Sequence, residues 1–179
     1  KILDRIKTMY TVAPEKITYC YSLWQPSFNE FARRGVVFQE GLPSLDQFSG
    51  LQDEVVVIDD LADKATGETE SFFTRGSHHK NLSVILLTQN IFEKRLRTIS
   101  LNGHYFIFCK SPRSTQQFEF FVQQIYGRDY KFAMEAYKDA MSENYGSLLV
   151  DLYPTTPECL RLHVNYLCGP QTYAYVNKK

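Results

Sequence analysis

The sequence predicts an α/β fold in which a mostly parallel sheet is flanked by helices. Strand-like and helix-like stretches alternate along the first two thirds of the chain, as they do where crossover helices join parallel strands. Residues 55–58 form an unbroken run of apolar β-branched side chains, which is typical of a strand buried on both faces. With 179 residues, 44% of them hydrophobic, the chain can bury one ordinary core. We therefore expect a single domain over residues 1–179.

The first two thirds of the chain predict five strands. Pro26 should open a short helix through Arg34, because proline is tolerated in a first helical turn and apolar residues recur at helical spacing after it. Residues 61 to about 77 are expected to be a helix or a partial helix, interrupted by the polar stretch 66–69. The expected strands span residues 17–24, 36–38, 55–58, 82–87 and 105–109.

The last third of the sequence changes character. Apolar residues at helical spacing predict two amphipathic helices over 114–126 and 130–141. Residues 146–153 and 160–167 are expected to be two carboxyl-terminal edge strands, which extend the sheet or pair antiparallel at its edge. At the other end, the chain begins without methionine inside what reads as a helix already under way, so we expect further sequence upstream.

Composition excludes several classes of protein. Twenty basic and twenty acidic side chains cancel, so no global field draws the chain to nucleic acid or to a membrane. The sequence has no signal peptide and no apolar run of bilayer length. Its four cysteines lack C-x-x-C spacing and are expected to be reduced and mostly buried: Cys20, Cys109, Cys159 and Cys168. A nuclear or cytoplasmic protein, not a secreted one, is expected.

Two adjacent carboxylates, Asp59 and Asp60, end the most apolar strand. A buried strand that delivers acid to its carboxyl end has the form of a Walker B motif, in which the first acid holds Mg²⁺ and the second polarises the attacking water. Aspartate is also a favoured helix N-cap and suits the helix dipole. From the strand and its acids alone, both interpretations stay open.

Polar residues also follow the next apolar strand, at Thr88-Gln89-Asn90. Carboxyl ends of strands are the side on which open α/β sheets bind ligands. An amide there could hydrogen-bond the attacking water or a γ-phosphate. A simple turn explains the same residues, and that alternative also stays open.

The segment from Thr74 to Asn81 carries two cations and two histidines. Adjacent side chains seldom converge on one ion, and no acid or cysteine lies at ligand spacing, so a metal site at His78-His79 is disfavoured. A carboxyl-terminal set of Cys159, His163 and Cys168 is discounted for the same kind of reason. Arg75 and Lys80 are better suited to reach a phosphate.

Together these phrases resemble one family. In order and spacing they are similar to the genome-packaging ATPases of Polinton/Maverick elements and related double-stranded DNA viruses, within the FtsK/HerA group. The resemblance covers roughly residues 15–167, and the phrases that carry it lie at residues 40–44, 55–61, 73–85, 87–90, 97–102, 110–113, 136–140 and 145–152.

The resemblance implies an additional-strand P-loop ATPase with a RecA/FtsK-type core, which uses ATP and Mg²⁺. Asp59 would be the Mg²⁺-associated acid, and Asp60 would stand where many relatives carry glutamate. Gln89 would be the sensor beside the acidic strand. Arg75 is our first candidate for an arginine finger acting across a subunit boundary and Arg97 the second, with Lys80 contacting phosphate. The implied partners are double-stranded DNA, capsid or portal-type proteins and identical subunits in a pentameric or hexameric ring, with no membrane.

The sequence departs from the family at one essential point. None of its nine glycines is followed by lysine, so the G-x-x-x-x-G-K-[ST] loop that cradles phosphates is missing, with the strand that would carry it. Two accounts follow: the chain is a fragment of an active packaging motor, or it is an inactive or domesticated remnant that binds DNA or protein. A plain α/β interaction domain without nucleotide history is a third class, which the resemblance disfavours.

Overall fold

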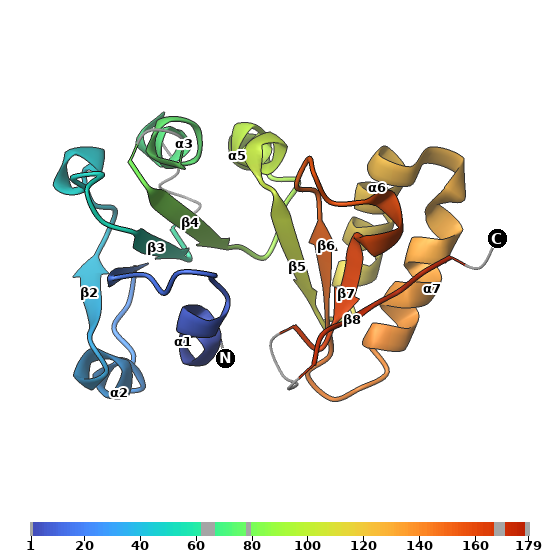
Figure 1. Ribbon diagram of the computed structural model, residues 1–179, viewed down its shortest axis with the longest axis horizontal. Coiled ribbons are helices and arrows are strands. Elements are labelled where there is room, and N and C mark those ends of the chain that lie inside the picture. The colour runs from blue at the N-terminus through green and yellow to red at the C-terminus, as the bar shows by residue number, and fades with distance from the viewer. Residues whose placement is uncertain (1, 62–66, 78–79, 167–170, 178–179) are drawn as a thin grey trace. The chain divides into compact units, whose positions relative to one another are not determined.

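The structure is a computed structural model that describes residues 2–61, 67–77, 80–166 and 171–177. The chain folds into two compact units, residues 2–102 and residues 103–179. Each unit has its own sheet and is described by itself (Figure 1). The single domain expected over the whole chain stays a prediction.

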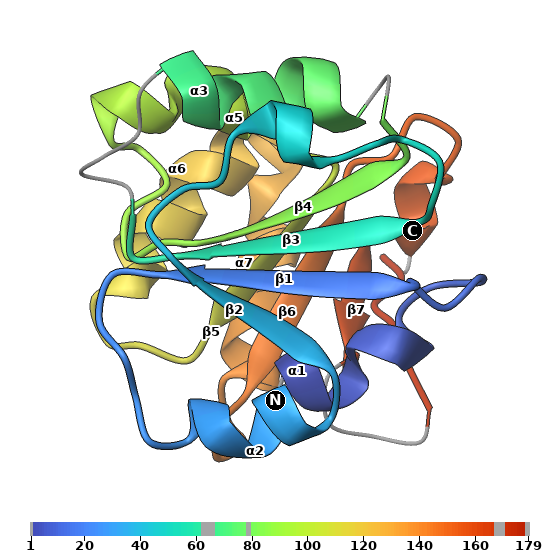
Figure 2. The same cartoon turned by 90° about the vertical axis from the view of Figure 1, so that its left-hand side faces the viewer.

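The amino-terminal unit contains a four-stranded sheet in which every pairing is parallel. The strands are ordered β2-β1-β3-β4, so β3 lies inside the sheet with a partner on each side. Parallel strands need crossover connections, and helical segments supply them (Figure 2). The α/β class is confirmed for this unit. The strands are β1 (Lys16–Tyr21), β2 (Val36–Glu40), β3 (Glu54–Asp59) and β4 (Leu82–Leu87).

Side chains alternate between two apolar cores, one on each face of this sheet. On one face, Val55 and Val57 of β3 pack with Ile6 and Phe28. These two come from the 3₁₀ turn η1 (Ile6–Thr8), which follows α1 (Ile2–Arg5), and from α2 (Phe28–Arg33). On the other face, Val56 and Ile58 pack with Phe48, Leu61 and Phe72. Burial on both faces explains why the sequence of β3 is a continuous apolar run and does not alternate.

The chain between β3 and the end of this unit contains more helix than the sequence predicted. After the short helix α3 (Gly67–Ser71), the helix widens into the π-helical turn η4 (Phe72–Gly76). Beyond β4 lie the 3₁₀ turn η5 (Lys94–Leu96) and the helix α5 (Arg97–Asn102), which packs against η4. No helix was predicted at α5 from the sequence. Buried Leu96 and Ile99 anchor this segment. A further 3₁₀ turn, η2 (Leu45–Gln47), precedes β3.

The carboxyl-terminal unit is an antiparallel sheet with two helices. Its strands are ordered β5-β6-β7-β8: β5 (Tyr105–Cys109), β6 (Ser147–Asp151), β7 (Leu162–Val164) and β8 (Tyr173–Ala174). The helices α6 (Ser114–Tyr126) and α7 (Tyr130–Ala140), joined by the 3₁₀ turn η6 (Gly127–Asp129), fall within one residue of their predicted bounds. The turn η7 (Glu158–Leu160) precedes β7.

Three aromatic contacts fix helices and sheet together in this unit. Phe118 of α6 meets Phe108 of β5 edge-on and stacks on Tyr137 of α7, while Phe121 packs on Phe106. The prediction that residues 105–109 form a fifth strand of the parallel sheet was wrong. Strand β5 instead pairs antiparallel with β6, with Phe108 opposite Leu148, because this pairing lets β5 share the core that α6 and α7 bury.

Two further expectations concern membranes and cysteines. Across the part of the chain that the structure describes, no helix is both long enough and apolar enough to cross a bilayer. Cys20 is buried in β1, but Cys109 and Cys159 are exposed, so the expectation that the cysteines are mostly buried was wrong for these two. Cys168 lies outside the described residues.

The burial of β3 gives a first prediction. Val56 is fully buried, whereas Val37 on the outer strand β2 is 48% exposed. Val56→Ala removes two buried methyl groups and leaves a cavity, so it should lower the free energy of unfolding by about 2 kcal/mol. The matched change Val37→Ala should lower it by less than about 1 kcal/mol. Urea unfolding followed by fluorescence of Trp24, the one tryptophan, reports on this unit; equal losses in the two variants would contradict the two-sided burial of β3.

Candidate functional site

The parallel register brings the predicted acids and the predicted amide to one edge of the sheet. Asp59 is the last residue of β3 and pairs with Leu87, the last residue of β4. Gln89 follows β4 by two residues and is exposed. The carboxyl ends of β3 and β4 therefore deliver Asp59, Asp60 and Gln89 to the same edge, which is the ligand-binding edge of open α/β sheets.

Asp59 does not point freely into solvent. It is half-buried, and the phenol of Tyr19 on the neighbouring strand β1 donates a 2.6 Å hydrogen bond to its Oδ2. Hydrogen bonds to an ionised acceptor are short and contribute about 1.5–3 kcal/mol. This contact fixes the plane of the Asp59 carboxylate.

Tyr19 is held in place by other aromatic rings. It is 7% exposed, and its ring lies 5.2 Å from that of Phe28 and 5.4 Å from that of Phe38, centroid to centroid. The pKa of the Tyr19 phenol is raised well above its usual value. Burial is the largest cause, followed by the hydrogen bond to Asp59 and the negative charge of Asp59. The phenol therefore stays protonated and remains the donor over the physiological range.

Asp60 turns the chain away from the sheet. Its φ is +52° and its side chain is exposed. Aspartate is one of the few residues other than glycine that adopt this left-handed conformation readily. The carboxylate of Asp60 therefore faces solvent immediately beyond Asp59. Residues 62–66 lie outside the described residues, so the alternative that these acids cap a following helix stays open.

The stretch Thr88-Gln89-Asn90 forms a turn. The Thr88 hydroxyl lies 3.3 Å from both the backbone N–H and the carbonyl oxygen of Asn90, and Asn90 Oδ1 accepts from the N–H of Phe92 at 3.0 Å. Thr88 and Asn90 thus use their polar groups to close the turn, as the simpler interpretation expected. Gln89 lies between them with its side chain exposed.

The two candidate arginines lie on neighbouring elements. Arg75 is in η4 and Arg97 begins α5, which packs against η4; both arginines are exposed. Arg75 donates a 2.9 Å hydrogen bond to Ser71 Oγ. Gly76, next to it, lies against Leu82 at the start of β4. Arg75 is therefore placed toward the amino end of β4, away from Asp59 of its own chain.

Lys80 lies away from the acidic edge of its own chain, and its contact with a phosphate stays a prediction. It precedes β4, whereas Asp59 ends β3, and parallel strands place these positions at opposite edges, roughly 17 Å apart at about 3.3 Å per residue. Its ammonium donates a 2.8 Å hydrogen bond to the carbonyl oxygen of Phe48. Lys80 closes the amino edge of the sheet.

The described residues contain no group of three or more His, Cys, Asp or Glu side chains that could hold a metal ion. His78 and His79 lie outside those residues, and His163 is a half-buried residue of β7. Mg²⁺ does not need such a cluster, because it keeps several waters and binds through one or two carboxylates together with substrate phosphates. Asp59 and Asp60 fit that requirement.

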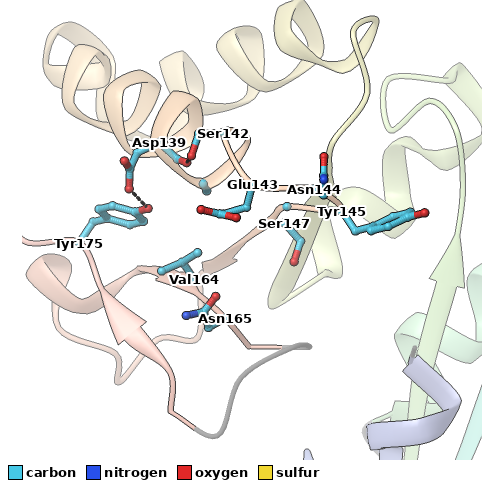
Figure 3. Close-up of a pocket in the computed structure, with 11 residues that line it drawn as sticks. Asp139, Ser142, Glu143, Asn144, Tyr145, Ser147, Val164, Asn165 and Tyr175 are labelled. Carbon is cyan, nitrogen blue, oxygen red and sulfur yellow. Dashed lines mark hydrogen bonds between the residues drawn. The ribbon is translucent and has the colours of Figure 1, made fainter.

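A hollow lies in the carboxyl-terminal unit (Figure 3). Its volume is about 240 Å³, and it is lined by the end of α7, the following loop and the segments around Val164 and Tyr175. Tyr175 donates a 2.6 Å hydrogen bond to Asp139 across it. None of the predicted site residues lines this hollow.

Tyr19 is the residue of the site that sequence reasoning missed. Its alternation with Ile17 and Tyr21 marked it only as a strand residue facing a core. The signal that could have found it is the register between β1 and β3. This register places Tyr19 on the same face of the sheet as Asp59, one strand away. That register follows from strand pairing and cannot be read from one strand alone.

Comparison of the chain with known protein families, with curated proteins and with solved structures finds no match.

The backbone of Asp60 gives a second prediction. Asp60→Asn and Asp60→Gly both keep a residue that tolerates φ +52°, so the free energy of unfolding should stay within about 0.5 kcal/mol of the wild type. Asp60→Ala keeps the Cβ but removes the polar side chain that eases the left-handed conformation, so it should lower the free energy of unfolding by about 1 kcal/mol. Urea unfolding of the three variants measures the difference, and an alanine variant as stable as the asparagine variant would argue against the left-handed turn.

Proposed function

We propose that this chain is part of an ATP-dependent motor that moves double-stranded DNA into a capsid. The observation that carries the proposal is the convergence of Asp59, Asp60 and Gln89 at the carboxyl edge of a parallel sheet, on adjacent strands. That is the arrangement expected for a metal-associated acid, a water-activating acid and a sensor amide. The DNA substrate in this proposal is supported by the sequence phrases that resemble packaging ATPases.

In this proposal, Asp59 would hold Mg²⁺, which would supply positive charge to offset that of the ATP phosphates. Asp60, exposed and immediately beyond Asp59, accepts a proton from the attacking water. Gln89 donates to or accepts from that water. An arginine of a neighbouring subunit, Arg75 or Arg97, stabilises charge on the transferred phosphoryl group.

The 179 residues do not supply the phosphate cradle, because no glycine is followed by lysine. We propose that a segment outside this sequence carries that loop, on a strand that joins the sheet beside β4. In support, β4 is the outermost strand of the order β2-β1-β3-β4. Each of its six residues, Leu-Ser-Val-Ile-Leu-Leu, is buried or half-buried. A strand with neither lysine nor proline is a poorly protected edge and suits pairing with another strand.

The third prediction tests the acids. In the protein expressed from the complete reading frame that encodes this chain, Asp60→Asn should lower the turnover of Mg²⁺-ATP at least about 100-fold, since it removes the general base while leaving a residue of the same shape. Nucleotide binding should be largely preserved. The control is Asp53→Asn, an exposed carboxylate at the opposite end of β3, which should leave turnover unchanged.

Undiminished hydrolysis by Asp60→Asn would remove the assigned role of Asp60. Residues 1–179 alone should show no measurable ATPase activity. Clear turnover by that chain would mean that the phosphate site lies elsewhere. If the complete protein binds DNA but neither binds nor hydrolyses ATP, the inactive DNA-binding remnant becomes the better account.

The fourth prediction tests the arginines. Arg75→Ala subunits and Asp60→Asn subunits should each be inactive alone, because an arginine finger accelerates hydrolysis about 10³–10⁵-fold. When mixed, they should recover part of the ATPase activity, since some interfaces then combine an intact Asp60 with an intact Arg75. The same experiment with Arg97→Ala distinguishes the two candidates, and Arg33→Ala, an exposed arginine of α2, is the control. If ATPase activity recovers in neither the Arg75→Ala mixture nor the Arg97→Ala mixture, neither arginine acts as the finger.

A further inference from the structure

The hydrogen bond from Tyr19 to Asp59 makes the two carboxylate oxygens of Asp59 inequivalent. Oδ2 accepts the Tyr19 phenol at 2.6 Å. Asp59 remains half-buried and not fully enclosed, at the exposed end of β3. The contact crosses between neighbouring strands, since Tyr19 lies in β1 beside Val57 of β3.

The donor is itself rigid. Tyr19 is 7% exposed, with its ring tilted against Phe28 and Phe38, which stack on each other at 4.7 Å. A phenol held in this way cannot follow the carboxylate through different rotamers. The Asp59 carboxylate therefore keeps the orientation that Tyr19 imposes.

We propose that Tyr19 is a positioning residue for a divalent cation at Asp59, holding Oδ2 so that Oδ1 is the oxygen presented to the ion. The inference rests on the proposed function, which assigns Mg²⁺ to Asp59. Mg²⁺ demands near-ideal octahedral geometry and so depends on an oriented ligand. Hydrogen-bond partners behind a metal ligand typically change metal affinity 10- to 100-fold when they are removed.

A purely structural role is the competing explanation. The same hydrogen bond would then join β1 to β3 and contribute to stability, with no effect on a metal. The two roles separate in a measurement of metal affinity on folded protein. The chain offers a matched control in Tyr21, two residues further along β1, whose ring packs in the same aromatic cluster against Trp24, Phe28 and Phe38.

The fifth prediction uses Mn²⁺ as a paramagnetic substitute for Mg²⁺ on residues 1–179. Mn²⁺ should broaden the amide signals of residues 58–60 in the wild type, and Asp59→Asn should abolish the effect. Tyr19→Phe should raise the Mn²⁺ dissociation constant about tenfold, whereas Tyr21→Phe should leave it unchanged. Trp24 fluorescence checks that each variant is folded. In the complete protein, Tyr19→Phe should raise the Mg²⁺ concentration for half-maximal ATPase about tenfold with kcat nearly unchanged at saturation.

Each outcome decides a different point. Wild-type affinity in Tyr19→Phe overturns the positioning role and leaves the metal assignment of Asp59 intact. No broadening near Asp59 in the wild type overturns the metal assignment itself, and with it this inference. If the Tyr19→Phe variant does not fold, a measurement on the wild type still tests the proposal. The Tyr19 hydroxyl proton should stay in its hydrogen bond to Asp59 at saturating Mg²⁺. Its loss would mean that the ion displaces Tyr19, which also overturns the proposal.

Discussion

The burial of β3 on both faces is the constraint on which the amino-terminal unit depends. Val55, Val56, Val57 and Ile58 are each at most 1% exposed, so no water reaches their backbone groups. Those groups must be paired within the protein. Strand β3 meets this requirement by pairing with β1 on one side and β4 on the other, both in parallel. Parallel pairing in turn forces the carboxyl ends of the three strands to one edge, so the position of Asp59 beside Tyr19 and Leu87 is a consequence of how the strand is buried.

The two edges of this sheet differ in how their polar groups are used. At the amino edge, Lys80 donates to the carbonyl of Phe48, the Asn81 side chain donates to the carbonyl of Gly50, and the Glu54 N–H donates to the carbonyl of Asn81. The Glu54 carboxylate, 5% exposed, lies 3.6 Å from the ammonium of Lys16. These contacts bind strands and loops to one another. At the carboxyl edge, Asp60 and Gln89 are exposed. One edge is therefore closed by contacts between strands and loops, whereas the other exposes the side chains of Asp60 and Gln89 to solvent.

Local pattern predicted what depends on a single segment. The strands β3 and β4 follow from their short apolar runs, and the helices α6 and α7 follow from apolar residues at helical spacing. Pairing between segments that are distant in the sequence was harder to predict. Strand β5 looks like any short apolar strand, and its antiparallel partner β6 lies about forty residues further along the chain. The position of Lys80 was hidden for a similar reason, because only the parallel pairing of β3 with β4 shows that it lies at the edge opposite Asp59. Tyr19 was missed because its role depends on its register beside β3.

The direction of any strand added to β4 decides what the acidic edge can do. Within the described residues β4 is the last strand on its side of the sheet, and its residues are buried or half-buried along their whole length. A strand paired parallel to β4 would end at the edge that holds Asp59 and Gln89, and a loop leaving it would emerge beside the acids. A strand paired antiparallel would emerge beside Lys80 and Glu54, at the edge that is already closed. Under the proposed function, only the parallel arrangement would bring backbone N–H groups for phosphate and the carboxylates of Asp59 and Asp60 to one place. The same topology that separates Lys80 from Asp59 thus restricts a completed nucleotide site to a parallel neighbour of β4.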